Sequence, residues 1–217
     1  MKIALINENS QAAKNSLIET ALRKVADTKG YEVVNYGMYG ADDAAQLTYV
    51  QNGILAAVLL NSGAADFVVT GCGTGEGAML ALNSFPGVIC GHVANALDAY
   101  TFAQINDGNA ISIPFALGFG WGGDLNLEYI FEKLYCEPSG GGYPKERVVP
   151  EQRNKKILDG VRAVHAVIPD FEAHGLHDLP ECFFNDPVLH CLAVFVDQCN
   201  SHSLTSYFFC CIDCCCV

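Results

Sequence analysis

The sequence predicts an α/β protein, a three-layer α/β/α sandwich in which helices cover both faces of a five-stranded parallel sheet. Short apolar segments alternate five times with segments of helical periodicity. The apolar segments are continuous, which is typical of parallel strands buried on both faces. A chain of 217 residues has room for one such domain and an extension, but not for two full domains.

Each expected element follows from a local pattern of residues. The expected strands span residues 2–6, 31–36, 67–69, 87–91 and 110–113. The first expected helix is capped by Asn9 or Ser10. The other expected helices span about 47–60, 78–83, 94–104, 124–134 and 151–168. Gly30 ends the first helix. We therefore expect a Rossmann-like domain over residues 1–150 and a C-terminal helical extension with a cysteine-rich tail over 151–217.

The composition argues against nucleic acid and membranes as partners. The formal net charge is −12, and 12 Lys and Arg residues do not supply a basic stripe for a polyanion. Although 51% of the residues are apolar, no run reaches the 18 residues of a spanning helix. The apolar run at residues 3–6 is too short for a signal-peptide core. We expect a cytoplasmic protein that acts on a small molecule.

The eleven cysteines predict reduced thiols rather than a disulfide framework, because five of them crowd the last eight residues. Cys211 and Cys214 have C-x-x-C spacing, but no second pair follows at zinc-finger distance. No histidine cluster has ligand spacing either. We therefore expect neither a metal nor an organic cofactor.

The most informative stretch is residues 66–78, in which a buried strand runs directly into a loop with glycine at positions 71, 73, 75 and 77. Removal of every second side chain lets backbone N–H groups approach a ligand closely, and a helix follows. In a parallel sheet this loop lies beyond the carboxyl ends of the strands, where ligands bind. The pattern predicts a cradle for an anion or an oxyanion.

Three side chains in this loop are candidates for chemistry. Cys72, near the expected start of a helix, is favoured as a thiolate base, although a cysteine there also suits a small buried apolar position. Glu76 is either a second proton acceptor or a solvated carboxylate that stabilises the helix dipole. Thr74 offers a hydroxyl to a substrate oxygen or caps the helix.

Gly73-x-Gly75-x-x-Ala78 also matches a dinucleotide fingerprint, which would indicate an NAD(P)-dependent oxidoreductase. That fingerprint normally follows the first strand, and here the first strand is followed by Asn7-Glu8-Asn9-Ser10. A phosphate-binding P-loop is excluded because no Gly-Lys-Ser/Thr closes the glycine run.

Residues 3–147 resemble the type B ribose-5-phosphate isomerase and galactose-6-phosphate isomerase family (RpiB/LacA/LacB). The resemblance rests on the motif from Gly71 to Gly77, on Asn83, and on Asn106-Asp107-x-Asn109. It implies a ketol isomerase that moves a proton between adjacent carbons through an enediolate, as a homodimer or homotetramer with a shared site. Cys72 matches the usual base, Glu76 matches the carboxylate base of other members, and Asn106 matches an asparagine that holds substrate.

Departures from the family pattern bear on the substrate. Glu8-Asn9 replaces Asp-His, Ile105 replaces the ring-opening histidine, and Tyr143 replaces the first of two phosphate-binding arginines, of which Arg147 is the second. An acyclic substrate with a carboxylate would need neither missing group. The chain also resembles a longer branch that isomerises 4-deoxy-L-threo-5-hexosulose uronate.

The resemblance thus implies a set of substrate-binding residues around the catalytic candidates. The set comprises Glu8, Asn9, Gly71, Gly73, Gly75, Gly77, Asn106, Tyr143 and Arg147. Two alternatives stay open, an isomerase of pentose, tetrose or hexose phosphates and a noncatalytic sugar-binding or regulatory module. Retention of Cys72, Thr74 and Glu76 favours an enzyme, because binding alone needs no base.

Overall fold

The computed structural model describes residues 1–165, and side chains for residues 1–160. The predicted extension beyond residue 165, with its terminal cysteines, lies outside the described residues. The sheet is parallel and five-stranded, in the order β2-β1-β3-β5-β4, which confirms the predicted architecture. The strands are β1 (Lys2–Ile6), β2 (Glu32–Asn35), β3 (Phe67–Cys72), β4 (Cys90–His92) and β5 (Ala110–Pro114).

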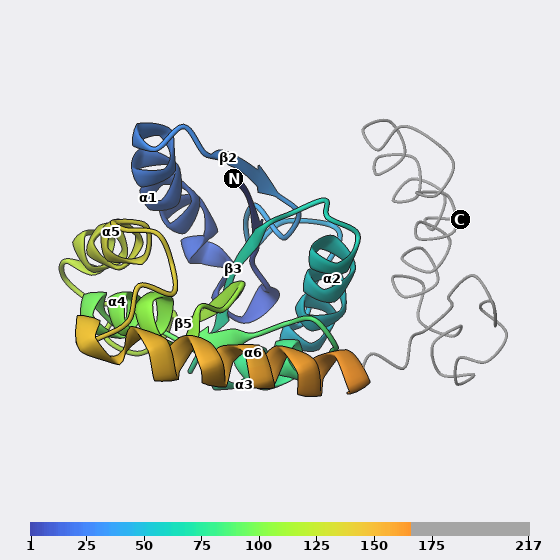
Figure 1. Ribbon diagram of the computed structural model, residues 1–217. Coiled ribbons are helices and arrows are strands. Elements are labelled where there is room, and N and C mark those ends of the chain that lie inside the picture. Colours follow the sequence, from blue (N-terminus) through green and yellow to red (C-terminus); the bar gives the residue numbers. More distant parts are fainter. Residues whose placement is uncertain (166–217) are drawn as a thin grey trace, which may run out of the picture. The chain divides into compact units, whose positions relative to one another are not determined.

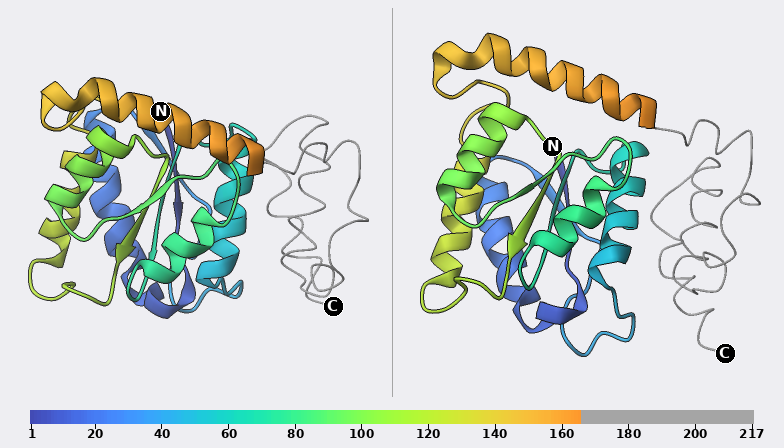
Figure 2. Two further views of the ribbon diagram at one scale, coloured as in Figure 1. Left: turned by 60° about the horizontal axis from the view of Figure 1, so that its bottom comes forward. Right: turned by 90° about the horizontal axis from the view of Figure 1, so that it is seen from below.

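Helices cover both faces of this sheet (Figures 1 and 2). The helices are α1 (Asn15–Thr28), α2 (Tyr49–Asn61), α3 (Glu76–Asn83), α4 (Ala96–Thr101), α5 (Gly123–Leu134) and α6 (Val148–His165), with short turns η1 (Asn9–Lys14), η2 (Phe102–Asn106) and η3 (Lys145–Arg147). Helices α1, α4 and α5 pack on one face, and α2 and α3 pack together on the other. No helix of the described part is long and apolar enough to cross a membrane.

The topology places a ligand crevice at one end of the sheet. Strand β1 pairs with β2 on one side and with β3 on the other. The loops that leave the neighbouring ends of β1 and β3 therefore lead away from each other, toward opposite sides of the sheet. Such a switch point is where open parallel sheets bind their ligands. The residues that follow Ile6 and Cys72 therefore line the expected site.

Two boundaries differ from those expected near this crevice. Gly71 and Cys72 belong to β3, which is buried over all six residues, because the ladder with β5 continues until Cys72 lies opposite Pro114. The first helix is not capped by Asn9 or Ser10. The η1 turn comes first, and its cap is the Glu8 carboxylate, which accepts from the Ser10 N–H at 2.8 Å.

The remaining differences are at element ends. The helix expected over 94–104 is split into the short α4 and the π-helical turn η2. The fourth strand is only three residues long. The helix expected from residue 151 begins earlier, at Val148, where its first turn is held by Glu151, whose carboxylate accepts from the Tyr143 N–H at 3.0 Å. Local patterns do not fix such ends, since tertiary hydrogen bonds decide them.

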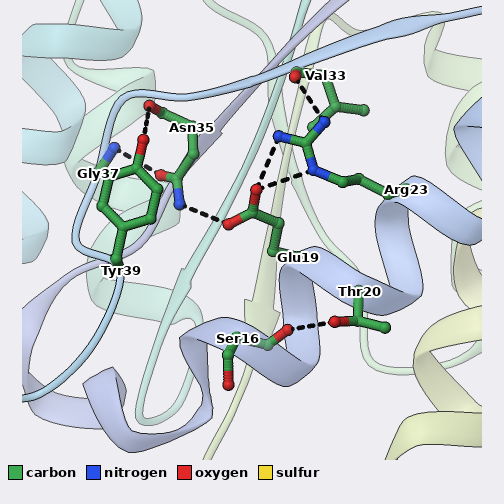
Figure 3. A network of polar contacts seen from close by, with 8 residues as sticks. All are labelled: Ser16, Glu19, Thr20, Arg23, Val33, Asn35, Gly37 and Tyr39. Carbon is green, nitrogen blue, oxygen red and sulfur yellow. Dashed lines mark hydrogen bonds and ion pairs between the residues drawn. The ribbon is translucent and has the colours of Figure 1, made fainter.

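A polar network joins α1 to the loop after β2 (Figure 3). The Glu19 carboxylate forms an ion pair with Arg23 at 2.7 Å and accepts from the Asn35 amide at 2.9 Å. Asn35, which is buried, accepts in turn from the Gly37 N–H at 3.0 Å. These contacts fix the start of the loop after β2 against α1.

Candidate active site

Cys72 at the end of β3 and the glycine loop at residues 73–75 are held to the sheet through their four carbonyl groups. Residues of β5 and the loop after it bind three of them. Phe115 N–H donates to Cys72 O at 2.9 Å, Ala116 N–H donates to Gly73 O at 2.8 Å, and Ser112 Oγ donates to Gly75 O at 2.5 Å. The carbonyl oxygens of the loop therefore face the sheet, and its peptide units are fixed in orientation.

The remaining carbonyl, that of Thr74, is bound by His92 at the end of β4. His92 Nε2 lies 2.9 Å from Thr74 O, and because a carbonyl only accepts, the ring proton in this contact is on Nε2. Gly75 has a φ of +77°, and a Cβ there would lie 2.9 Å from Pro114 N and 3.0 Å from His92 Nε2. Only glycine fits both the conformation and the space.

The amide groups of the same loop are left for a ligand. Among the described residues, no backbone or side-chain acceptor binds the N–H groups of Gly73, Thr74, Gly75 or Gly77. Helix α3 begins at Glu76, so its N-terminal N–H groups add to this set. Carbonyls turned inward and amides left unbound form a cradle suited to an anionic oxygen.

The catalytic candidates lie around this cradle. Cys72 is the last residue of β3, 6% exposed and not in a disulfide, and it precedes the first residue of α3 by four positions. It lies at the strand end rather than inside the loop. Thr74 and Glu76 are both exposed, and the Thr74 hydroxyl is 3.4 Å from the Glu76 N–H. All three residues are thus at the carboxyl edge of the sheet.

Glu8 and Asn9 reach this edge from β1. Both oxygens of the buried Glu8 carboxylate are bonded to Ser10, at 2.8 Å to its N–H and 2.5 Å to its hydroxyl. The Asn9 side chain is exposed, and the backbone N–H of Asn9 donates to Leu47 O at 2.8 Å. Glu8 therefore shapes the loop after β1, whereas the Asn9 amide is accessible to a ligand.

Asn106, in contrast, lies at the opposite end of the sheet. It ends η2, directly before β5, whereas Cys72 ends β3 next to the last residue of β5. A five-residue strand is about 16 Å long, which exceeds the length of a six-carbon sugar. Asn106 and Cys72 of one chain therefore do not contact the same substrate molecule.

Tyr143 and Arg147 lie on the same amino edge as Asn106. The turn before them is fixed to η2, because the N–H groups of Gly140 and Gly142 donate to carbonyls of that segment at 2.9 Å. Figure 2 shows α6, which follows this turn, crossing the end of the sheet opposite to the arrowheads. The side chains of Tyr143 and Arg147 are exposed. The predicted site residues thus fall into two groups that one chain does not bring together.

Two residues at the carboxyl edge were not predicted from the sequence. His92 holds the glycine loop, and Lys14, at the end of η1, donates to Phe115 O next to it. No motif marks either residue. For His92 the available signal was its position at the end of a predicted strand, where parallel sheets carry functional side chains.

Residues 3–124 match the family described as Ribose/Galactose Isomerase, which is more than half of the chain. The chain belongs to this family. The expected isomerase class is thereby confirmed, and the NAD(P)-dependent oxidoreductase is not supported. In the described part of this isomerase, no three His, Cys, Asp or Glu side chains are grouped as metal ligands.

Three solved structures are similar to this isomerase. A 4-deoxy-L-threo-5-hexosulose-uronate ketol-isomerase complexed with a tartrate is 57% identical, with a TM-score of 0.77, over 89% of this chain and 87% of that one. A ribose-5-phosphate isomerase from Vibrio parahaemolyticus is 46% identical, with a TM-score of 0.77, over 90% and 99% of the two chains. A type B ribose 5-phosphate isomerase from Trypanosoma brucei, at 19% identity and a TM-score of 0.61 over 74% and 97%, shares the fold.

Proposed function

We propose that this chain interconverts the aldose and ketose forms of an acyclic sugar acid such as 4-deoxy-L-threo-5-hexosulose uronate. The observation that carries the proposal is the polarity of the glycine loop, whose carbonyls are bound by β4, β5 and the loop after it while its amides have no acceptor among the described residues. Such amides stabilise an enediolate oxygen. The 57% identical ketol-isomerase acts on that uronate, and its complex contains tartrate, a dicarboxylate.

In this proposal Cys72 is the base. Its thiolate removes a proton from the carbon next to the carbonyl, the electron pair of that C–H bond forms a C=C bond, and the π pair of the C=O bond moves to the oxygen, which gives the enediolate. The Cys72 thiol then returns the proton to the neighbouring carbon, so no external oxidant or reductant is consumed. Glu76 carries the hydroxyl proton between the two oxygens of the enediolate, and the Thr74 hydroxyl donates a hydrogen bond to one of these oxygens.

We also propose that the active site is completed by a second copy of the chain. Asn106, Tyr143 and Arg147 would then bind the substrate held by Cys72 of the partner subunit. Their exposure at the amino edge, about one strand length from Cys72 of the same chain, supports this assignment. A homodimer contains two such sites, and a homotetramer contains four.

A sugar phosphate is the second candidate substrate. The 46% identical protein from Vibrio parahaemolyticus is a ribose-5-phosphate isomerase, and Arg147 offers an exposed cation for a phosphate. Ile105 and Tyr143 favour the uronate instead, because Ile105 has no group that moves a proton for ring opening and Tyr143 carries no positive charge.

The deciding experiment is a substrate panel followed by proton NMR in deuterium oxide. The panel contains the unsaturated-uronate product, ribose 5-phosphate, a tetrose phosphate and galactose 6-phosphate, with Cys72→Ala as the control. We expect turnover of the uronate, deuterium exchange at one carbon, and no loss of activity after EDTA treatment. Preferential turnover of a phosphate would assign the second candidate, and binding without exchange would indicate a noncatalytic module.

A further inference from the structure

The loops at the carboxyl edge of the sheet carry a single cationic side chain, that of Lys14. These loops span residues 7–14, 36–48, 73–75, 93–95 and 115–122, all within the described part of the chain. They also carry the carboxylates of Glu8, Asp42 and Asp43. Apart from the amides of the glycine loop and the N-terminus of α3, an anionic substrate at this edge therefore has Lys14 as its one cationic side chain among these loops.

Lys14 lies within reach of the glycine loop. Its ammonium donates to Phe115 O, and the N–H of Phe115 donates to Cys72 O at 2.9 Å. Two hydrogen bonds and one residue length place the ammonium at most about 9 Å from Cys72 O. The reacting carbon of a six-carbon acid lies four or five bonds, about 6 Å, from its carboxylate. A substrate held at the loop can therefore extend to Lys14.

The bonding of Lys14 leaves capacity for a ligand. An ammonium has three N–H donors, and those that are bonded donate to neutral oxygens, Phe115 O and Gln11 Oε1, the latter at 2.8 Å. The ring centroid of Phe119 lies 4.6 Å away. Within the described residues no carboxylate approaches Lys14 to ion-pair distance. Exposed cations such as Arg147 share this property, but Lys14 is partly buried.

From this arrangement we infer that Lys14 binds the anionic end of the substrate, a carboxylate or a phosphate, and so sets the preference for charged over uncharged sugars. The inference rests on the proposed function, since it places the substrate at the glycine loop. A half-buried ammonium with only neutral oxygens as acceptors is completed by an anion, and such a charge-assisted bond is short and strong. Lys14 makes this contact from the same subunit as Cys72, unlike Arg147.

The test compares Lys14→Met and Lys14→Arg with the parent enzyme. Methionine keeps an unbranched apolar side chain but has no charge. With the acidic substrate we expect Lys14→Met to raise KM about 10- to 100-fold while kcat changes less than about threefold, and Lys14→Arg to retain most of the affinity. The uncharged sugar of the same length, with CH₂OH in place of the carboxylate, should be affected less than threefold by either variant.

The matched control is Phe119→Leu, which removes the ring beside the ammonium and leaves the charge in place. It should lower stability slightly and leave the KM of the acid within about threefold. An equal loss of kcat/KM on the acid and on the uncharged sugar in Lys14→Met would overturn the inference, because Lys14 would then only hold the loop. Parallel assays with the uronate and a sugar phosphate show whether Lys14 binds a carboxylate or a phosphate.

A direct binding measurement separates this inference from the proposed function. Calorimetric titration with malonate and with inorganic phosphate requires no turnover. Binding by the parent enzyme that is lost in Lys14→Met supports the inference even if every sugar in the panel fails to react. Binding that is equal in the two proteins, or absent in both, refutes it whatever the isomerase assays give.

Discussion

His92 Nε2 lies 2.9 Å from the carbonyl oxygen of Thr74, so the last residue of β4 holds the tip of the glycine loop that follows β3. The contact joins neighbours that are 18 positions apart in the chain. It turns the Thr74 carbonyl away from the crevice and thereby sets the direction of the amides beside it. His92 is a positioning residue, because it acts on the substrate through the loop.

His92→Phe should therefore reduce kcat about 10- to 100-fold, since it keeps a ring but removes the donor that orients the loop. His92→Gln, whose amide nitrogen reaches a similar position, should retain at least about a third of the parent turnover. The measurement is steady-state kinetics beside thermal unfolding. An equally large loss of kcat in both variants, with a changed pH profile in the residual activity of His92→Gln, would instead make His92 a proton carrier.

Cys72→Ala should lose about two to four orders of magnitude in turnover, the usual contribution of a positioned general base, with little change in melting temperature. Glu76→Gln should lose less, because it only carries the second proton. Kinetics with the best substrate of the panel measure both. Near-normal turnover in Cys72→Ala together with an inactive Glu76→Gln would reverse the two roles.

Mixing two inactive variants tests the shared site. Cys72→Ala and Arg147→Ala each damage a different half of the site, at opposite edges of the sheet. If each site uses both subunits, a refolded equimolar mixture contains hybrid dimers with one intact site and should regain roughly a quarter of the parent activity. Activity no higher than that of the unmixed variants, or only monomer in light scattering, would refute the proposal.

Burial raises the pKa of Asp107, the nearby Asp159 adds to this effect, and Lys155 opposes it. The raised pKa means that the ionised carboxylate is disfavoured in the folded state. This destabilisation is absent below the unfolded pKa, near 3.9, and complete above the folded one.

Asp107→Asn should therefore raise the melting temperature by about 1 to 3 °C at pH 7, and the gain should shrink toward pH 4. Asparagine also tolerates the φ of +47° at this position. Thermal melts of both proteins from pH 4 to pH 8 measure the effect. A difference that is constant across this range would attribute the gain to the backbone alone.

Much of the fold was predictable because its signals are local. Continuous apolar segments and helical periodicity identified the five parallel strands and the helices between them. Gly71 and Cys72 were expected in the loop because glycine usually ends a strand. The structure keeps both in β3, since a Cβ at residue 71 would lie 2.3 Å from Ile113 O, so the close approach of β5 requires glycine inside the strand.

The sequence by itself determined the catalytic candidates, because Cys72, Thr74 and Glu76 lie within five consecutive positions and so stay at one edge of the sheet in any parallel arrangement. Only the tertiary structure decided which other residues join them. Asn106 and Arg147 fall on the far edge of the sheet, whereas His92 and Lys14 reach the loop from positions 18 and 101 residues distant from their partners. Such contacts depend on strand order and direction, which a local pattern of residues does not contain.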